Sequence, residues 1–182
     1  ILVGPVYGSK KFRRQLVDAV KSMKVDWPDN LAASIGAVIQ KPEGKLERAL
    51  TTLEDGESWL LEPKKLDSSG RLWRPGIKLG VKPGSFFHMT EVFGPVLGIM
   101  KAKDLDDAIK LQNAPSYGLT AGIHSLDNSE VLTWVNQVNN GNLYVNRGIT
   151  GAIVQRQPFG GIKRSSVGAG LKAGGSSYIT QF

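Results

Sequence analysis

Apolar residues near the start of the chain switch between strand-like and helical spacing. Residues 1–6 form a short apolar run, which predicts a strand ending at Gly4-Pro5. Ser9 is a suitable N-cap for the helix predicted next. The apolar face of that helix is predicted from residues at helical spacing, namely Phe12, Leu16, Ala19, Val20 and Met23.

A second helix is predicted to open at Pro42 and to end at Gly56. Residues 72–81 look extended but are interrupted by Pro75-Gly76, which predicts an edge or irregular strand. The same stretch of sequence also predicts a strand over residues 58–61, a turn over residues 67–70 and a loop over residues 82–90.

The second half of the chain repeats strand and helix signals. The apolar run 96–100, placed directly after Gly94-Pro95, predicts a buried strand. Asp104 is predicted to cap a helix that runs to about Gln112. The remaining predictions are a strand over residues 119–125, a helix capped by Asn128 and closed by Gly141, and a strand over residues 143–145.

Alternating strands and helices predict an α/β fold with a mostly parallel, twisted sheet and helices on both faces. We expect residues 1–164 to form this domain portion, without a catalytic cysteine segment. Residues 165–182 are rich in Gly and Ser, including Gly168, Gly170, Gly174 and Gly175. They predict either a loosely ordered tail or an arm that packs on another domain or subunit.

Composition and charge are those of an ordinary globular protein. The 182 residues are 41% hydrophobic and 21% charged, and no apolar run is long enough to span a membrane. The net charge of +7 has no accompanying nucleic-acid motif or aromatic-interleaved basic patch, so we predict no nucleic-acid partner. A solvated helix face, or attraction of anionic substrates and cofactors, accounts for it.

The absence of cysteine restricts the chemistry of this chain. With no cysteine there is no disulfide, no thiolate metal site and no cysteine nucleophile within these residues. The two histidines, His88 and His124, are far apart in sequence and have no second ligand at metal spacing. We predict structural roles for both and no metal site.

Glu91 and Phe93 place a carboxylate and an aromatic ring two residues apart, directly before Gly94-Pro95. They are predicted to lie on a loop where the chain enters the sheet, near the crevice where open α/β sheets bind ligands. A carboxylate there could accept hydrogen bonds from the hydroxyls of a sugar, and a ring could pack on a flat ligand. The alternative is a capping Glu and a core Phe.

Three motifs in this order resemble the NAD(P)-dependent aldehyde dehydrogenase superfamily. They are Glu91-Val92-Phe93-Gly94-Pro95-Val96-Leu97, Gly141-Asn142-Leu143-Tyr144-Val145-Asn146 and Pro158-Phe159-Gly160-Gly161. The resemblance extends over essentially the whole chain, and it implies that the chain is a fragment of a longer enzyme. The chain opens at Ile1 without Met or a charged leader, which agrees with that expectation.

The resemblance implies a mechanism whose central groups lie outside this sequence. In the family, a cysteine thiolate attacks the aldehyde, hydride passes to NAD(P)+, and a Glu-activated water hydrolyses the thioester. We therefore predict no catalytic residue in this chain and no activity for the chain alone. The resemblance implies that Glu91 holds the hydroxyls of the nicotinamide ribose and that Phe93 packs beside this ribose, with NAD as the cofactor.

The segment from Arg147 to Val154, followed by Gln157 to Gly161, is similar to the substrate loop of glutamate-γ-semialdehyde (1-pyrroline-5-carboxylate) dehydrogenases. This implies that the N–H groups of Gly151 and Ala152 bind the substrate carboxylate as a small anion nest. Phe159 would pack on the substrate methylenes. Alternatives are a surface turn with a core Phe, an enzyme for another aldehyde, or a noncatalytic assembly domain of this fold.

Further expectations concern the full-length protein. The same module occurs alone and fused to a flavin-dependent proline dehydrogenase in proline utilization A proteins, so FAD is expected only where such a fusion exists. The resemblance implies a homo-oligomer, cytoplasmic in a bacterium and in the mitochondrial matrix in a eukaryote. Ser166 stands where the family usually has Gly, so a turn requiring positive φ there would be strained or shifted.

Overall fold

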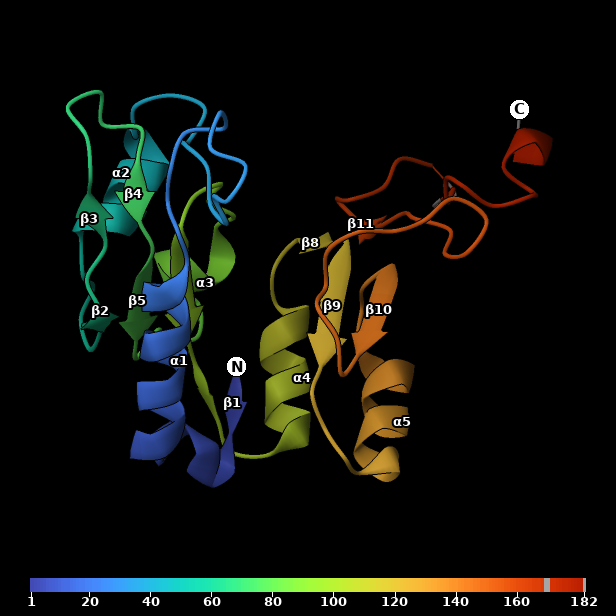
Figure 1. Cartoon of the computed structure of the whole chain (residues 1–182). Helices are drawn as coiled ribbons and strands as arrows, with labels where there is room; N and C mark the ends of the chain where they lie inside the picture. The colour runs from blue at the N-terminus through green and yellow to red at the C-terminus, as the bar shows by residue number, and fades with distance from the viewer. Residues whose placement is uncertain (169–170, 182) are drawn as a thin grey trace. The chain divides into compact units, whose positions relative to one another are not determined.

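Two structural units make up the chain, residues 1–103 and residues 104–182 (Figure 1). This computed structural model describes residues 1–168 and 171–181. Gly170 lies outside the described residues, as do its neighbour at 169 and the last residue of the chain. The predicted division between residues 1–164 and a tail over residues 165–182 therefore stays a prediction.

Helix α1 (Lys10–Ser22) is confirmed where the sequence predicted it. It begins after Ser9, whose hydroxyl oxygen accepts a hydrogen bond from the backbone N–H of Phe12. Its apolar face, with Val20 buried, packs on the core of the first unit. The predicted first strand is shorter than expected, because β1 (Leu2–Val3) gives way at once to the 3₁₀-helix η1 (Gly4–Gly8).

A three-stranded sheet forms the centre of the first unit. It contains β2 (Ser58–Leu61), β5 (Gly76–Leu79) and β6 (Val96–Ile99) in the order β2-β5-β6. Strand β5 runs antiparallel to β2 and parallel to β6. Of the two alternatives predicted for residues 72–81, the irregular strand is confirmed, because the extended segment is interrupted at Pro75. The edge position is wrong, because β5 is the middle strand and Pro75 lies just before it.

Lys78 is a charged residue buried in the middle strand of this sheet, with 1% of its surface exposed. Its Nζ donates to the Thr52 carbonyl oxygen at 2.6 Å and to Glu57 Oε2 at 3.1 Å. The ammonium also lies 5.2 Å from the ring centre of Trp59 and 5.0 Å from that of Phe87. The buried charge is therefore paired, hydrogen-bonded and enclosed by aromatic faces.

Around this sheet the structure corrects two predicted elements. Helix α2 (Gly44–Thr51) starts after Glu43 and ends well before Gly56. The loop predicted over residues 82–90 contains a short helix, α3 (Phe86–Met89), capped by Ser85. The predicted turn at residues 67–70 is confirmed, and it joins the strands β3 (Lys64–Lys65) and β4 (Trp73–Arg74).

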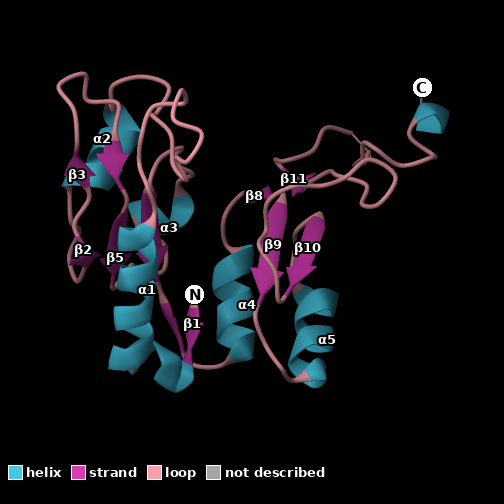
Figure 2. Cartoon of the chain, viewed as in Figure 1, coloured by secondary structure: helices cyan, strands magenta, loops and turns pink. Residues whose placement is uncertain are grey.

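The second unit packs two helices on two parallel strands (Figure 2). Its core is formed by Ile109, Ala121, Trp134 and Val138. The indole N–H of Trp134 donates to Gln112 Oε1 at 2.8 Å, so the buried ring keeps its hydrogen bond. The elements are α4 (Leu105–Asn113), β8 (Tyr117–Gly118), β9 (Thr120–Ile123), α5 (Asn128–Gln137), β10 (Asn142–Val145), β11 (Ile162–Lys163) and η2 (Ile179–Gln181).

Of the helix ends predicted in the second unit, the start of α4 is confirmed and both ends of α5 are corrected. Asp104 caps α4 as expected, accepting from the backbone N–H of Asp107. Asp127 caps α5, so the prediction of Asn128 was one residue late. Gly141 does not close α5, which ends at Gln137 with an extended Val138 as its C-cap. The glycine lies against the backbone of Gly160 instead.

The predicted α/β class with parallel strands is confirmed. Parallel pairs are β5–β6, β9–β10 and β1 with β7 (Lys101–Ala102). Antiparallel pairs are β2–β5, β3–β4 and β8–β11. Within the described residues, every helix is too short or too polar to cross a lipid bilayer.

Candidate functional site

Glu91 and Phe93 lie on the loop between α3 and β6, as the sequence predicted. Two tight backbone hydrogen bonds shape this loop, from Gly94 N to the Val92 carbonyl at 3.1 Å and from Val96 N to the Gly94 carbonyl at 2.9 Å. The loop therefore has a defined path into the sheet, and it places Glu91 and Phe93 just before the first residue of β6.

Exposure distinguishes between the two interpretations of this pair. Phe93 is 74% exposed, so it is not a core side chain. Lys45 Nζ lies 5.8 Å from the centre of its ring. Among the described residues, the exposed Glu91 carboxylate has no hydrogen bond or ion pair, so it caps no helix. Both groups are open to a ligand.

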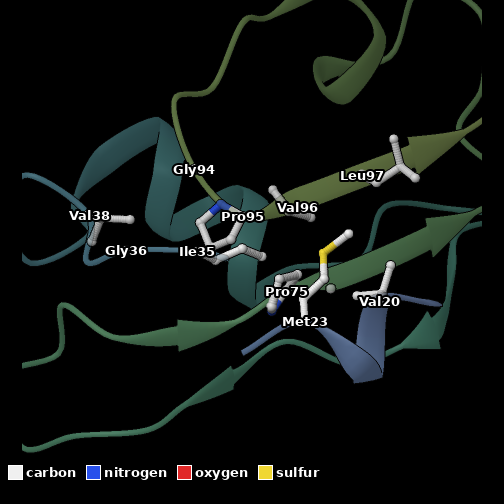
Figure 3. A pocket seen from close by; sticks show the side chains of 11 residues that line it. Val20, Met23, Ile35, Gly36, Val38, Pro75, Gly94, Pro95, Val96 and Leu97 are labelled. Carbon is white, nitrogen blue, oxygen red and sulfur yellow. The ribbon is translucent and has the colours of Figure 1, made fainter. Parts of the chain in front are cut away.

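An open apolar cleft of about 440 Å³ lies beside this loop, with Gly94 and Pro95 in its wall (Figure 3). The residues that line it come from α1 and its C-cap, from residues 35–38, from residues 75–76 and from β6. They include Val20, Met23, Ile35, Val38 and Leu97. The cleft offers packing surface, and no titratable side chain lines it.

Gly151 and Ala152 lie in the second unit, on an exposed loop after β10. Gly151 has φ +79°, a conformation that glycine adopts without strain. Its carbonyl oxygen accepts a hydrogen bond from Tyr144 Oη at 3.1 Å. In the part of the chain that the structure describes, the N–H groups of Gly151 and Ala152 have no hydrogen-bond partner. Two backbone donors are thus available to an anion.

Phe159 is partly buried and its backbone is held on both sides. It forms an antiparallel bridge with Ala173, with N···O distances of 2.8 and 2.9 Å. On its other side, Asn142 bonds to the carbonyl of Pro158 and to the N–H of Gly160, at 3.0 and 2.9 Å. The roles of Asn142 and Tyr144 were not predicted from the sequence, where they are polar residues at alternate positions, in and just before the strand predicted over residues 143–145.

The five predicted site residues fall into two groups. Glu91 and Phe93 share one loop of the first unit. Gly151, Ala152 and Phe159 share one segment of the second unit, where the side chains of β10 reach both ends of that segment.

Among the described residues, four aspartates have pKa values below the usual range. They lie in loops, turns or helix caps, and none belongs to either group of predicted site residues. Hydrogen bonds from a neighbouring side chain, and mostly also from backbone N–H groups, hold these pKa values below the usual range, so the groups stay ionised at neutral pH and are poor general acids. The residues, each with the partner of its strongest hydrogen bond, are Asp26 (Asn30), Asp55 (Lys82), Asp67 (Ser69) and Asp127 (Ser129). No cluster of three or more His, Cys, Asp or Glu is placed to hold a metal within the described ranges.

The Ser166 position does not strain the chain. Non-glycine residues with positive φ in the described chain are Asn146, Gln155 and Lys163, and Ser166 is not among them. Gly168 adopts φ +65° two residues later. The positive φ values nearest to Ser166 in the described chain are those of Lys163, at +54°, and Gly168.

Gly141→Ala is expected to destabilise the second unit. A Cβ at this position would lie 1.9 Å from the Gly160 carbonyl oxygen and 2.7 Å from the Gly161 Cα. Forcing apart two backbones costs about 1–3 kcal/mol. Urea unfolding measures this loss, with Gly148→Ala as the control, because a Cβ there meets only Thr150 Oγ1 at 4.0 Å. Equal midpoints for the two variants would contradict the packing described here.

The chain belongs to the aldehyde dehydrogenase family, whose sequence profile matches residues 6–182. This confirms the resemblance inferred from the three ordered motifs. Proline utilization A (PutA) from Corynebacterium freiburgense shares 56% identity and a TM-score of 0.94, covering 99% of this chain and 18% of that protein. These two findings also confirm the fold class.

Relatives shorter than the PutA protein also resemble this chain over nearly its whole length. The 1-pyrroline-5-carboxylate dehydrogenase of Geobacillus sp. (strain WCH70) is 34% identical, over 98% of this chain and 34% of that protein. A Thermus 1-pyrroline-5-carboxylate dehydrogenase solved with bound NAD shares 30% identity and a TM-score of 0.81, over 95% of this chain and 33% of that one. This chain thus spans about a third of the length of such relatives.

Proposed function

We propose that this chain is part of an NAD-dependent dehydrogenase that oxidises L-glutamate γ-semialdehyde to L-glutamate in proline catabolism. The observation that carries the substrate assignment is the pair of unbonded N–H groups at Gly151 and Ala152, next to a positive φ at Gly151. The names of the relatives, 1-pyrroline-5-carboxylate dehydrogenase and proline utilization A, support the assignment.

Substrate binding in this proposal uses the loop of the second unit. The N–H groups of Gly151 and Ala152 donate to the α-carboxylate, while Phe159 packs on the methylenes between that carboxylate and the aldehyde. Holding the far end of the substrate fixes the position of the aldehyde carbon. Fixed geometry of this kind lowers the entropic part of the barrier to reaction.

Glu91 and Phe93 serve the cofactor in this proposal. The Glu91 carboxylate accepts hydrogen bonds from both hydroxyls of the nicotinamide ribose, and Phe93 packs beside that ribose. The exposed loop and its unpaired carboxylate support this role. Bound NAD supplies the hydride acceptor, and this chain contributes the orientation of the ring rather than a reacting group.

The chain alone is proposed to be inactive. It contains no cysteine, and the family mechanism requires a thiolate nucleophile. In the full-length protein that carries this chain, the nucleophile comes from residues outside it. A flavin enters only where that protein is fused to a proline dehydrogenase, and we propose a homo-oligomer as its assembled form.

Glu91→Gln is expected to weaken NAD+ use in that full-length protein. Gln keeps an acceptor oxygen but loses the charge, and a hydrogen bond to a charged group exceeds a neutral one by about 1 kcal/mol. We expect KM for NAD+ to rise about fivefold. Glu62→Gln is the matched control, because Glu62 is also an exposed carboxylate of the first unit. A KM that is equal in the two variants would remove Glu91 from the cofactor site.

A further inference from the structure

Asn142 and Tyr144 are two buried polar residues on strand β10, with 3% and 2% of their surfaces exposed. They are two positions apart in a strand, so their side chains leave the same face of it. Both side chains end on the backbone of the segment that follows, at its two functional ends. The proposed function uses that segment but assigns no task to either side chain.

Asn142 and Ala173 together fix the two peptide groups that flank Phe159. Asn142 Nδ2 donates to the Pro158 carbonyl at 3.0 Å, and the Gly160 N–H donates to Asn142 Oδ1 at 2.9 Å. Ala173 takes the remaining N–H and C=O of the same two peptides. The two N–H and two C=O groups of these peptides are thus all hydrogen-bonded. The backbone at Phe159 is therefore held in one conformation.

Tyr144 determines the orientation of a different peptide group, the one that joins Gly151 to Ala152. Its Oη donates to the Gly151 carbonyl oxygen at 3.1 Å. In a trans peptide the C=O and the following N–H point in opposite directions, and no described peptide bond is cis. The Ala152 N–H therefore points away from Tyr144.

The hydrogen bond from Tyr144 matters because it is the one hydrogen bond of residues 147–152 in the described chain. The other contacts of this part of the loop leave the Gly151–Ala152 peptide free: Arg147 lies 5.1 Å from the Tyr144 ring centre, and Ile149 packs on Gly122. Residues 147–152 lie in the loop after β10, and no backbone–backbone hydrogen bond joins them to another described residue. If the Gly151–Ala152 peptide rotated by half a turn, a carbonyl oxygen would replace the N–H that faces the ligand. A carbonyl dipole repels a carboxylate, so the flipped loop would not bind an anion.

We propose that Asn142 and Tyr144 are positioning residues for substrate selection. Tyr144 acts through the Gly151 carbonyl to aim the Ala152 N–H at the substrate carboxylate, and Asn142 acts through the peptides of Phe159 to hold its ring. This inference rests on the proposed function, because it assigns supports to the substrate contacts named there. It adds that two side chains of β10 support separate parts of substrate recognition. Tyr144 supports recognition of the carboxylate, and Asn142 supports recognition of the methylenes.

The first test compares Tyr144→Phe with Tyr117→Phe in the full-length protein. The readout is the ratio of kcat/KM for glutamate-γ-semialdehyde to kcat/KM for an aldehyde of equal length without the α-carboxylate. Loss of one neutral hydrogen bond is expected to lower this ratio about two- to tenfold in the Tyr144 variant. Tyr117 is half-exposed on β8 and serves as the control for the same chemical change. A purely structural role for Tyr144 would lower both kcat/KM values together and leave the ratio unchanged.

Asn142→Leu separates the second role from the first. Both aldehydes share the methylenes that Phe159 contacts, so KM for both is expected to rise by a similar factor while kcat and the ratio of the two kcat/KM values stay constant. A fall in kcat for both aldehydes would show a purely structural role for Asn142. A change in the ratio as large as that of Tyr144→Phe would overturn the division of roles.

Trypsin cleavage provides a readout that needs no aldehyde. Arg147 and Arg156 are exposed and bracket the loop, so cleavage after them, followed by mass spectrometry, reports how firmly it is held. Tyr144→Phe is expected to raise the cleavage rate and Tyr117→Phe to leave it unchanged. A wild-type kcat/KM ratio near one would overturn the proposed function, and the cleavage rate then decides the anchoring by itself. An unchanged cleavage rate in the Tyr144 variant overturns this inference in either case.

Discussion

Lys78→Ala is expected to destabilise the first unit by about 3–5 kcal/mol, the cost of breaking a buried ion pair from one side. The side chains of Lys78 and Glu57 are 2% and 1% exposed. Removing the ammonium would leave the Glu57 carboxylate buried without a counter-ion. Its Oε1 atom already lacks a hydrogen-bond partner in the described structure, so little remains to compensate the charge.

The loss would also reach the loop that carries Glu91. Glu57 Oε2 accepts from the Glu54 N–H at 3.0 Å, and Glu54 Oε2 accepts from the N–H of Phe86 at 3.4 Å. Phe86 begins helix α3, which ends just before that loop. The buried charge of Lys78 is therefore connected to the loop that carries Glu91 through the side chains of Glu57 and Glu54.

Two controls give this prediction its specificity. Lys82→Ala removes a cation from an exposed pair with Asp55 and is expected to leave the urea midpoint almost unchanged. The double variant Lys78→Met with Glu57→Gln removes both charges and is expected to be more stable than Lys78→Ala. Urea unfolding at one protein concentration compares all three. A Lys78→Ala midpoint equal to that of Lys82→Ala would show that the buried pair contributes nothing.

The second large effect concerns the substrate carboxylate. Each hydrogen bond to a charged group contributes about 1.5–3 kcal/mol, so two N–H donors predict at least about 100-fold discrimination. The comparison is between glutamate-γ-semialdehyde and an aldehyde of equal length without the α-carboxylate. Both share the aldehyde and the chain that Phe159 would contact, so the difference isolates the anion site.

Gly151→Ala tests whether the backbone conformation is responsible for this preference. A Cβ at Gly151 has no heavy atom within 4 Å, so the substitution causes no clash. Its φ of +79° nevertheless disfavours any L-residue, by about 1–2 kcal/mol in the left-handed region. We expect discrimination to fall about five- to thirtyfold. Gly148→Ala, in the same loop without a positive φ, is expected to retain it. Equal discrimination in both variants would mean that the Gly151 conformation has no part in it.

Local signals predicted the elements that local forces determine. Ser9 and Asp104 cap their helices because a side-chain oxygen meets an N–H three residues on. Pro42 was a misleading helix start, because Gly44 adopts φ +54° and so breaks a helical path from Pro42. Pro75 was a misleading sign of an edge strand, because it lies before β5 and not within it. The burial of Lys78 could not be predicted either, since it depends on its distant partner Glu57.

The candidate site divides in the same way. The position of Glu91 and Phe93 on a loop followed from the Gly94-Pro95 turn, and the freedom of Gly151 to take positive φ followed from its lack of a side chain. The supports from β10 could not be predicted. They depend on contacts between residues up to 18 positions apart, which arise only when the strand and the later loop pack together.

The most direct test is the ratio of kcat/KM for the two aldehydes in the full-length wild-type protein that carries this chain. A preference of at least about 100-fold for glutamate-γ-semialdehyde is the predicted result, and it would support the anion site at Gly151 and Ala152. A ratio near one, with good activity on both aldehydes, would contradict it. The chain would then remain a member of the aldehyde dehydrogenase family, but without the proposed substrate.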